Sequence, residues 1–299
     1  MSLFSERNGL RKPVEKTFDI TEAVYSVLYD SCEKYLIHLA YLFSEECGDG
    51  RGCYDIDRKK FEIQLTVEIP DLFRDENGYS RKPEMGEGES YDQYALLDYI
   101  EYIGKKMRDY QEGDYHSYFR HTHIHFLKSD NCFDDYQDEI NNIFEKTGLQ
   151  YILTDDKRIE RNVGNNVVLE VAEETVEDLK ERGAKDLIKE SLQLYKSPRP
   201  ESRRDAMEKI WDAFERIKTY YKDLKKDLSS EKIINDIADG NDSYYDLIET
   251  EYRKLTSIGN SFRIRHHETD KIDIINPDLY DYFYERCLSL VMLSVKYLK

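Results

Sequence analysis

Near the C-terminus, six consecutive residues combine the side chains that are needed to bind and cleave RNA. The run is Arg263-Ile264-Arg265-His266-His267-Glu268, and it lies between two stretches of helical periodicity. Imidazole titrates near neutral pH, so His266 and His267 could take a proton from a ribose 2′-hydroxyl or give one to the leaving 5′ oxygen. Guanidinium stays charged and matches phosphate as a two-pronged donor, which is the role open to Arg263 and Arg265.

The spacing of the two histidines limits this chemistry. Adjacent residues of an extended segment point to opposite sides, so His266 and His267 are not expected to face one phosphate together, and a second protomer would supply the other group. The alternative interpretation is structural. In it, the arginines pair with carboxylates of an acidic chain, and the histidines cap the preceding helix.

A second group of histidines lies in the middle of the chain. His116 is followed by His121, His123 and His125 at a period of two. Such residues share one face of a strand, and that face could hold zinc in a metal-dependent enzyme. Because no nearby carboxylate or cysteine obviously completes a tetrahedral set, we favour an aromatic-rich surface strand, and we predict no metal and no other cofactor.

Composition and charge restrict the classes of function. The 299 residues are 39% apolar and carry a net charge of −18. The chain can bury a sizeable core, and its charge opposes sequence-blind binding to nucleic acid or anionic membranes, so any RNA site must be local. Five cysteines without a CxxC pair, among them Cys47 and Cys53 as expected free thiols, favour a reduced, cytoplasmic protein. No apolar run approaches the length of a membrane span.

Helical periodicity dominates the rest of the chain. The expected helices are Thr21–Glu46, Tyr91–Tyr110, Asp134–Thr147, Ala184–Tyr195, Ser202–Leu228, Ser230–Ala238, Tyr244–Ile258 and Leu279–Leu298. Two short apolar pieces, Leu149–Leu153 and Val167–Val171, predict a small β element, whereas Phe61–Phe73 alternates without deciding between a strand and an irregular segment. We therefore expect a mainly α fold, with an N-terminal helical domain over residues 1–175 that contains the small β element, and a C-terminal helical bundle over residues 176–299.

Several motifs resemble those of AbiJ-like abortive-infection proteins. Trp211-Asp-Ala-Phe-Glu215 and Leu255-Thr-Ser-Ile-Gly-Asn260-Ser-Phe-Arg263-Ile-Arg-His-His267 are similar to the HEPN-type C-terminal domains of that group. The segments Phe4–Arg7, Ile69–Phe73 and Glu139–Phe144 are similar to its N-terminal domains. The resemblance implies a prokaryotic antiviral protein with a HEPN-like bundle that is commonly dimeric and that, in active members, is a metal-independent endoribonuclease.

The sequence departs from the motif of active HEPN enzymes, in which an Arg precedes the His by a few residues. With His266 as the motif histidine, Gly259 stands at the usual Arg position and Asn260 follows it. Either Arg263 or Arg265 has taken over the Arg role, or this chain has lost the nuclease chemistry. The resemblance also implies that an acidic residue of the second helix, Glu208 or Glu215, orients the basic group.

Two hypotheses of function follow. In the first, the chain is an abortive-infection effector that cuts host or phage RNA, with RNA bound at the local basic site. In the second, it is a non-catalytic HEPN dimer that acts as a sensor or binding scaffold, with the N-terminal domain recognising a phage product. We expect a homodimer through the C-terminal bundle, a phage-derived trigger and no membrane partner.

Overall fold

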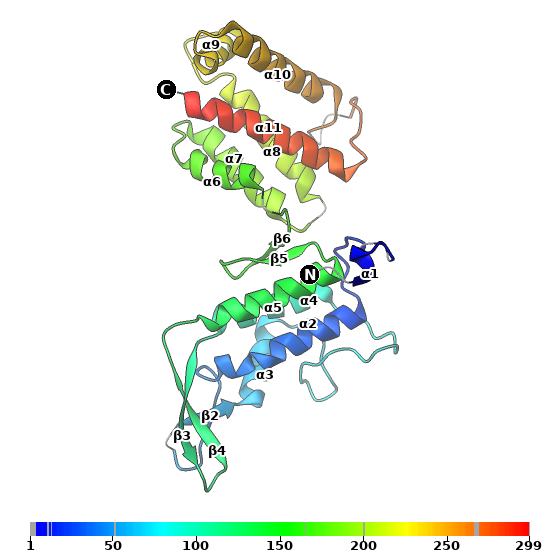
Figure 1. The fold of residues 1–299 in the computed structure, drawn as a ribbon, viewed down its shortest axis with the longest axis vertical. Coiled ribbons are helices and arrows are strands. Elements are labelled where there is room, and N and C mark those ends of the chain that lie inside the picture. Colours follow the sequence, from blue (N-terminus) through cyan, green and yellow to red (C-terminus); the bar gives the residue numbers. More distant parts are fainter. Residues whose placement is uncertain are drawn as a thin grey trace. The chain divides into compact units, whose positions relative to one another are not determined.

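The chain forms two compact units, Met1–Glu160 and Arg161–Lys299, each with its own hydrophobic core. The structure is a computed structural model that describes residues 4–10, 12, 14–50, 52–164, 166–199, 201–265 and 269–298. Its elements are mainly helical with a small sheet, which confirms the expected fold class (Figure 1). The expected boundary at residue 175 falls inside a helix, Val167–Glu177, which packs Leu169 and Val176 into the core of the second unit.

Helices α2, α4 and α5 supply most of the core of the first unit. The helices of this unit are α1 (Phe4–Arg7), α2 (Glu22–Lys34), the 3-10 helix η1 (Leu36–Leu39), α3 (Arg58–Glu68), α4 (Gln93–Lys106) and α5 (Cys132–Thr147). Thr21 and Asp92 begin α2 and α4, because their side chains accept hydrogen bonds from free backbone N–H groups of the first turn. Gly148 ends α5 as the sequence predicts, with the positive φ of 76° that glycine adopts readily.

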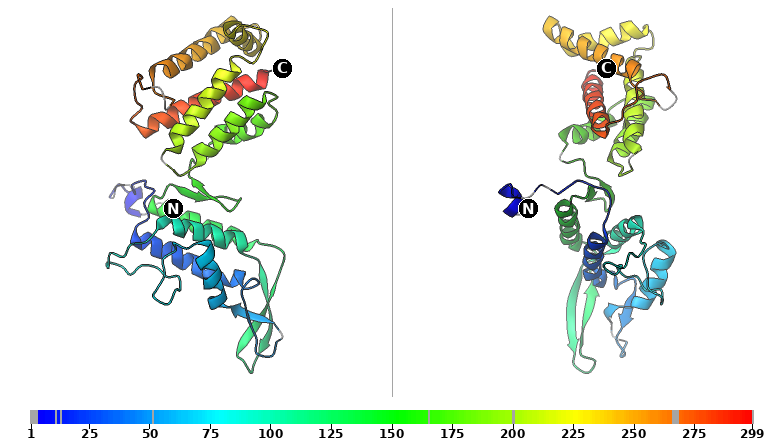
Figure 2. Two further views of the ribbon diagram at one scale, coloured as in Figure 1. Left: turned by 180° about the vertical axis from the view of Figure 1, so that it is seen from behind. Right: turned by 90° about the vertical axis from the view of Figure 1, so that its right-hand side faces the viewer.

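A four-stranded antiparallel sheet completes the first unit. Its order is β1-β2-β4-β3, with β1 (Ser44–Glu46), β2 (Cys53–Ile56), β3 (Tyr110–His116) and β4 (His121–Phe126). Strands β3 and β4 form a long hairpin that extends beyond the helices of this unit (Figures 1 and 2). The pairing shifts by one residue between Glu112 and Tyr115, where β3 contains a β-bulge. A separate pair joins β5 (Tyr151–Leu153) to β6 (Ile159–Arg161).

Several expectations for secondary structure need correction. The helix predicted from Thr21 to Glu46 ends at Lys34, and its last residues form β1, because they pair with β2. The partner of β5 is Ile159–Arg161, whereas Val167–Val171 is helical because it packs into the core of the second unit.

The alternating segment Phe61–Phe73 begins within helix α3, so it is neither the strand nor the irregular segment that was considered. Phe61 and Leu65 are one turn apart and fully buried, whereas Ile63 and Val67 are also one turn apart and are mostly exposed. The alternation thus arises from two apolar faces of one helix.

The second unit is a helical bundle. Its helices are α6 (Val167–Glu177), α7 (Arg182–Lys196), α8 (Ser202–Ile217), α9 (Lys226–Ala238), α10 (Asp242–Ser261) and α11 (Pro277–Tyr297). Helix α8 packs against α7 and α11, and α9 packs against α10. The helix predicted to run to Leu228 ends at Ile217, and its last residues belong to α9. Among the described residues, no helix combines the length and apolarity needed to cross a membrane.

Candidate functional site

The arginines of the predicted site lie just after α10, in the connection to α11. The backbone N–H of Arg263 donates to the carbonyl of Ile272 at 2.8 Å, and the N–H of Ile272 donates to the carbonyl of Ser261 at 3.0 Å. Ile264 is fully buried between the two arginines. These hydrogen bonds fix the backbone that carries Arg263, because they join the end of α10 to the later part of the same connection.

Arg265 is held by a carboxylate of α8. Its Nε and Nη2 donate to Oδ1 of Asp212 at 3.0 and 2.6 Å. The side chains keep 31% and 34% of their surface exposed, so the pair is reachable from solvent. Arg263 donates from Nη1 to Oδ1 of Asp273 at 3.0 Å. Both guanidinium groups are therefore positioned by carboxylates of the second unit.

The predicted catalytic histidines, His266 and His267, lie outside the described residues. The described part of the predicted site is therefore formed by the two arginines and the acidic and amide groups proposed to support them. Of these, Glu208 lies on α8 one turn before Asp212 and is partly exposed.

Glu215 contacts lysines and is placed three residues beyond the aspartate that holds Arg265. It pairs with Lys218 and, at 2.6 Å, with Lys226. Burial alone would raise the pKa of Glu215, but these two ammonium groups lower it. Burial lowers the pKa of Lys218, although Glu215 opposes the shift. The basic partners of Glu215 are thus lysines at the end of α8 and the start of α9.

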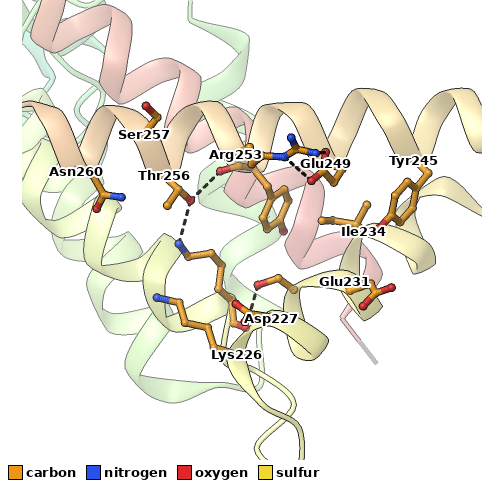
Figure 3. Close-up of a pocket in the computed structure, with 13 residues that line it drawn as sticks. Lys226, Asp227, Glu231, Ile234, Tyr245, Glu249, Arg253, Thr256, Ser257 and Asn260 are labelled. Atoms are coloured by element: carbon orange, nitrogen blue, oxygen red, sulfur yellow. Dashed lines mark hydrogen bonds and ion pairs between the residues drawn. The ribbon is translucent and has the colours of Figure 1, made fainter.

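Asn260 lines a hollow of about 660 Å³ between the end of α8, α9 and α10 (Figure 3). Lys218 also lines it and donates to Oγ1 of Thr256 at 3.2 Å. The other charged lining groups are of both signs: Lys226, Asp227, Glu231, Glu249 and Arg253. Carboxylates repel phosphate, so this lining, with as many acidic as basic groups, gives the hollow no excess of positive charge for an RNA phosphate.

The acidic residue that holds Arg265 was not identified from the sequence. The expectation that Glu208 or Glu215 orients the basic group stays a prediction, and the carboxylate that contacts Arg265 is that of Asp212. All three lie on α8 at spacings of three or four, so they share one side of the helix. The sequence therefore indicated an acidic side of α8. It did not indicate which of the three carboxylates contacts Arg265, because that depends on where the connection after α10 crosses α8.

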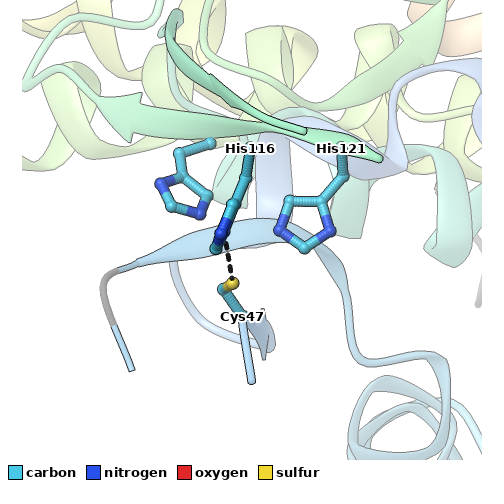
Figure 4. A group of neighbouring side chains, drawn as sticks. Cys47, His116 and His121 are labelled. Atoms are coloured by element: carbon cyan, nitrogen blue, oxygen red, sulfur yellow. Dashed lines mark hydrogen bonds between the residues drawn. The ribbon is translucent and has the colours of Figure 1, made fainter. Parts of the chain in front are cut away.

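In the first unit, the histidines of the β3–β4 hairpin gather around a cysteine. The ligand atoms of Cys47, His116, His121 and His123 all lie within 4.8 Å of one another. Sγ of Cys47 is 3.3 Å from Nδ1 of His116 (Figure 4). Partial burial and the imidazoles of His123 and His116 lower the pKa of His121, which favours its neutral form. These four side chains are a group that could hold a metal ion.

This arrangement corrects the expected face of three histidines at period two. His125 is exposed and outside the group, and its place is taken by His116. Cys47 supplies the sulfur that no residue close in sequence offered, since it precedes His116 by 69 positions. Cys53, the other cysteine of the glycine-rich run, directs its thiol to backbone carbonyls, and the five cysteines are free.

Comparison with known proteins identifies the first unit. Residues 2–178, more than half of the 299, match the family model described as AbiJ N-terminal domain 4. No curated protein and no solved structure matches the chain. The matched segment contains the whole first unit, with the sheet and the Cys47 group, and extends to the end of α6. The chain therefore belongs to the AbiJ family of abortive-infection proteins, through an N-terminal domain of the fourth AbiJ type.

Proposed function

We propose that this protein is an abortive-infection effector whose second unit is a HEPN-like bundle that cleaves RNA without a metal ion. The family of the N-terminal domain supports a place in phage defence. The observation that carries the nuclease proposal is the position of Arg265. It is fixed by Asp212, partly exposed, and next in the chain to His266 and His267.

The proposed reaction is an internal attack of RNA on its own phosphate. One imidazole, from His266 or His267, removes the proton of the ribose 2′-hydroxyl, whose oxygen then attacks phosphorus. A second imidazole protonates the 5′ oxygen as its bond to phosphorus breaks. Arg263 and Arg265 stabilise the negative charge that develops on the phosphate oxygens, which is usually the largest catalytic contribution. The products have a 2′,3′-cyclic phosphate end and a 5′-hydroxyl end.

Asp212 acts as a positioning residue in this proposal. An arginine side chain has several rotatable bonds, and its charge stabilises the transition state only when the guanidinium is held beside the phosphate. Both hydrogen bonds from Arg265 go to one oxygen of Asp212, which restricts the orientation of the guanidinium plane. The carboxylate also offsets part of the positive charge, so the site is suited to one phosphate more than to a long stretch of backbone.

A homodimer supplies the second imidazole in the proposed mechanism. Four apolar side chains are substantially exposed in the connection after the arginines and at the start of α11: Ile272, Ile275, Leu279 and Tyr282. Because this patch begins at the residue that hydrogen-bonds to Arg263, its association with a second copy brings two sets of arginines and histidines near each other. The proposal requires these side chains to form one apolar surface, because contiguous apolar patches mark association sites.

The test combines phage challenge with analysis of RNA ends. Cells that express the wild-type chain should survive as a population and show new RNA cuts with 2′,3′-cyclic phosphate ends. Separate Arg265→Ala, His266→Ala and His267→Ala changes identify the groups that matter. Arg182→Ala is a matched control, because Arg182 lies on the same unit, its side chain is 94% exposed, and its contact to Asp186 is long, at 3.9 Å.

The outcomes separate the two hypotheses. Loss of both protection and cleavage in folded Arg265→Ala and His266→Ala or His267→Ala proteins, with the Arg182→Ala protein active, supports the nuclease. Protection that persists without any RNA cleavage overturns it and supports a HEPN dimer that acts as a sensor or binding scaffold. Products with 3′-hydroxyl and 5′-phosphate ends would instead indicate a metal-activated water as the nucleophile.

A further inference from the structure

The group around Cys47 is built from three separate segments of the first unit. Cys47 directly follows β1, His116 ends β3, and His121 and His123 lie on β4. Figure 4 shows the labelled imidazoles of His116 and His121 side by side, with the side chain of Cys47 pointing toward His116. One sulfur and three imidazoles within 4.8 Å of one another form a compact set of soft and borderline metal ligands.

The surrounding chain holds these side chains in place. The ring of His121 stacks on Tyr54 at a centroid distance of 3.9 Å and an angle of 5°. Gly48 packs directly under Phe119, since a Cβ at this position would lie 3.1 Å from the ring. Gly50 has a φ of 70°, and its N–H donates to the carbonyl of Cys47 at 2.8 Å. The glycine-rich loop therefore turns tightly around the thiol.

Two imidazole nitrogens of the group lack hydrogen-bond partners. Nε2 of His121 and Nε2 of His123 are both buried, and neither has a partner within the described part of the chain. A buried polar atom without a partner is costly and is rare in native proteins. Two such atoms in one group of potential ligands point to a bound species that the protein atoms alone do not supply.

We propose that Cys47, His116, His121 and His123 bind one Zn²⁺ ion in a closed structural site. Zinc prefers tetrahedral nitrogen and sulfur ligands, at about 2.0–2.1 Å for Zn–N and about 2.3 Å for Zn–S. These lengths place neighbouring ligand atoms about 3.5 Å apart. The Cys47–His116 distance of 3.3 Å is close to this value, and the four ligand atoms lie within 4.8 Å of one another.

The ligand count decides between a structural and a catalytic metal. Four protein ligands fill a tetrahedral zinc ion, whereas catalytic sites keep one position for water or substrate. Binding converts the thiol of Cys47 to a thiolate and releases its proton. Three neutral imidazoles and one thiolate leave a single positive charge. Oδ2 of Asp49, which is 3.4 Å from Nδ1 of His116, provides a carboxylate beside it.

The metal would connect the loop between β1 and β2 to the end of the β3–β4 hairpin. Within the described residues, the backbone pairing between β2 and β4 is limited to the register position Cys53–Ile124. A shared ion thus fixes parts of the first unit that are far apart in the sequence. It is separate from the proposed RNA site, whose residues all belong to the second unit.

The first measurement is the zinc content of the full-length chain after purification without affinity metals or chelators. We expect about one zinc ion per chain. Cys47→Ser and His123→Ala should each lower the content tenfold or more. Cys53→Ser and His125→Ala are matched controls, because they change the same residue types in the same segments outside the group, and both should keep the zinc.

Substitution of zinc by Co²⁺ tests the ligand types in the wild-type chain, so this result does not depend on whether the ligand variants fold. Wild-type protein loaded with Co²⁺ should show the intense visible bands of tetrahedral cobalt and a thiolate-to-cobalt charge-transfer band, and Cys53→Ser should show the same spectrum. A wild-type chain that binds neither zinc nor cobalt overturns the proposal. So do an octahedral cobalt spectrum without charge transfer, and equal loss of metal in the two control variants.

Discussion

The contact between Gly259 and Trp211 allows a quantitative test of the second unit. Gly259 lies on α10, and a Cβ at this position would be 1.8 Å from Cζ2 and 2.3 Å from Cη2 of Trp211. The indole is 4% exposed and packs in the core on α8. Carbon atoms that are not bonded approach to about 3.5–4.0 Å, so Gly259→Ala requires the ring or the helix to move by roughly 1.7 Å or more.

Two opposing contributions set the magnitude of the effect. Alanine gains about 1 kcal/mol over glycine within a helix. Overpacking of a close-packed core costs typically 1–3 kcal/mol, and sometimes more; a displacement of this size belongs at the upper end. We therefore expect Gly259→Ala to lower the free energy of unfolding of the second unit by about 2 kcal/mol. At roughly 2–4 °C per kcal/mol for a domain of this size, the melting temperature should fall by about 4–8 °C.

Trp211 is the only tryptophan in the chain, so its fluorescence reports the unfolding of the second unit selectively. Urea and thermal transitions of the full-length Gly259→Ala protein should be compared with Gly183→Ala. At Gly183, a Cβ would meet the guanidinium of Arg216 at 2.4 Å, which is the far end of a flexible side chain and can move away. In that control, the helical gain of alanine opposes the loss of the exposed Arg216–Glu181 contact, so it should unfold within about 0.5 kcal/mol of wild type. A Gly259→Ala protein as stable as the control would refute the reasoning.

Three further predictions concern association, buried charge and pH. Ile275 is 90% exposed, so Ile275→Asp should keep the helical circular dichroism of the folded chain but shift it from dimer to monomer in light scattering. Its unfolding transition should lose any dependence on protein concentration. An unaltered dimer would contradict the proposed surface. Glu62 is buried and accepts from Nε of Arg58 at 3.0 Å and from the N–H and hydroxyl of Ser80. Glu62→Ala should therefore lower the free energy of unfolding of the first unit by about 3 kcal/mol, measured by urea titration followed by circular dichroism. A loss below about 1 kcal/mol would be inconsistent with that network. Hydrogen bonds from Ser129 and from the N–H groups of Cys132 and Asn131 lower the pKa of Asp109. Because its folded-state pKa lies below its unfolded value of about 3.9, its stabilising effect is present above that pH and is lost progressively as the pH falls toward the folded-state pKa. Asp109→Asn should therefore flatten the loss of thermal stability as the pH falls from about 4 to 2, and an unchanged acid slope would argue against this assignment.

The sequence predicted elements best where the local pattern and the tertiary environment agree. The buried side of α8 contains Ile210 and Phe214 one turn apart, and Gly148 ends α5 in the conformation that glycine favours. The prediction for α3 was ambiguous because both of its faces are apolar, so the residues alternate although the backbone is helical. The expected β partner at Val167–Val171 was wrong, since a short apolar run does not specify its partner.

The candidate sites were predictable only in part, for a geometric reason. Arg263 and Arg265 were chosen as candidates because they lie two positions apart and are flanked by helical stretches, and their role in RNA cleavage stays a prediction. The role of Asp212 was missed, because three carboxylates share one stripe of α8 and only the path of the connection selects among them. Cys47 was missed as a partner of the histidines because residues 69 positions apart are brought together by strand pairing, which no local spacing reports.

The bulge in β3 makes the histidine group depend on residue count as well as residue type. In a regular strand, His116 would lie on the opposite face from Gln111, which is paired with His125. Gly113 and Asp114 together face the single residue His123, and this extra residue turns His116 to the side of His121. Deletion of one bulge residue would make the ladder regular and keep His116 paired with His121. Insertion of one residue between the bulge and His116 would instead move the His116 imidazole to the opposite face of the sheet from His121. The group is thus tolerant of a shortened strand and vulnerable to a lengthened one, although neither change alters a ligand.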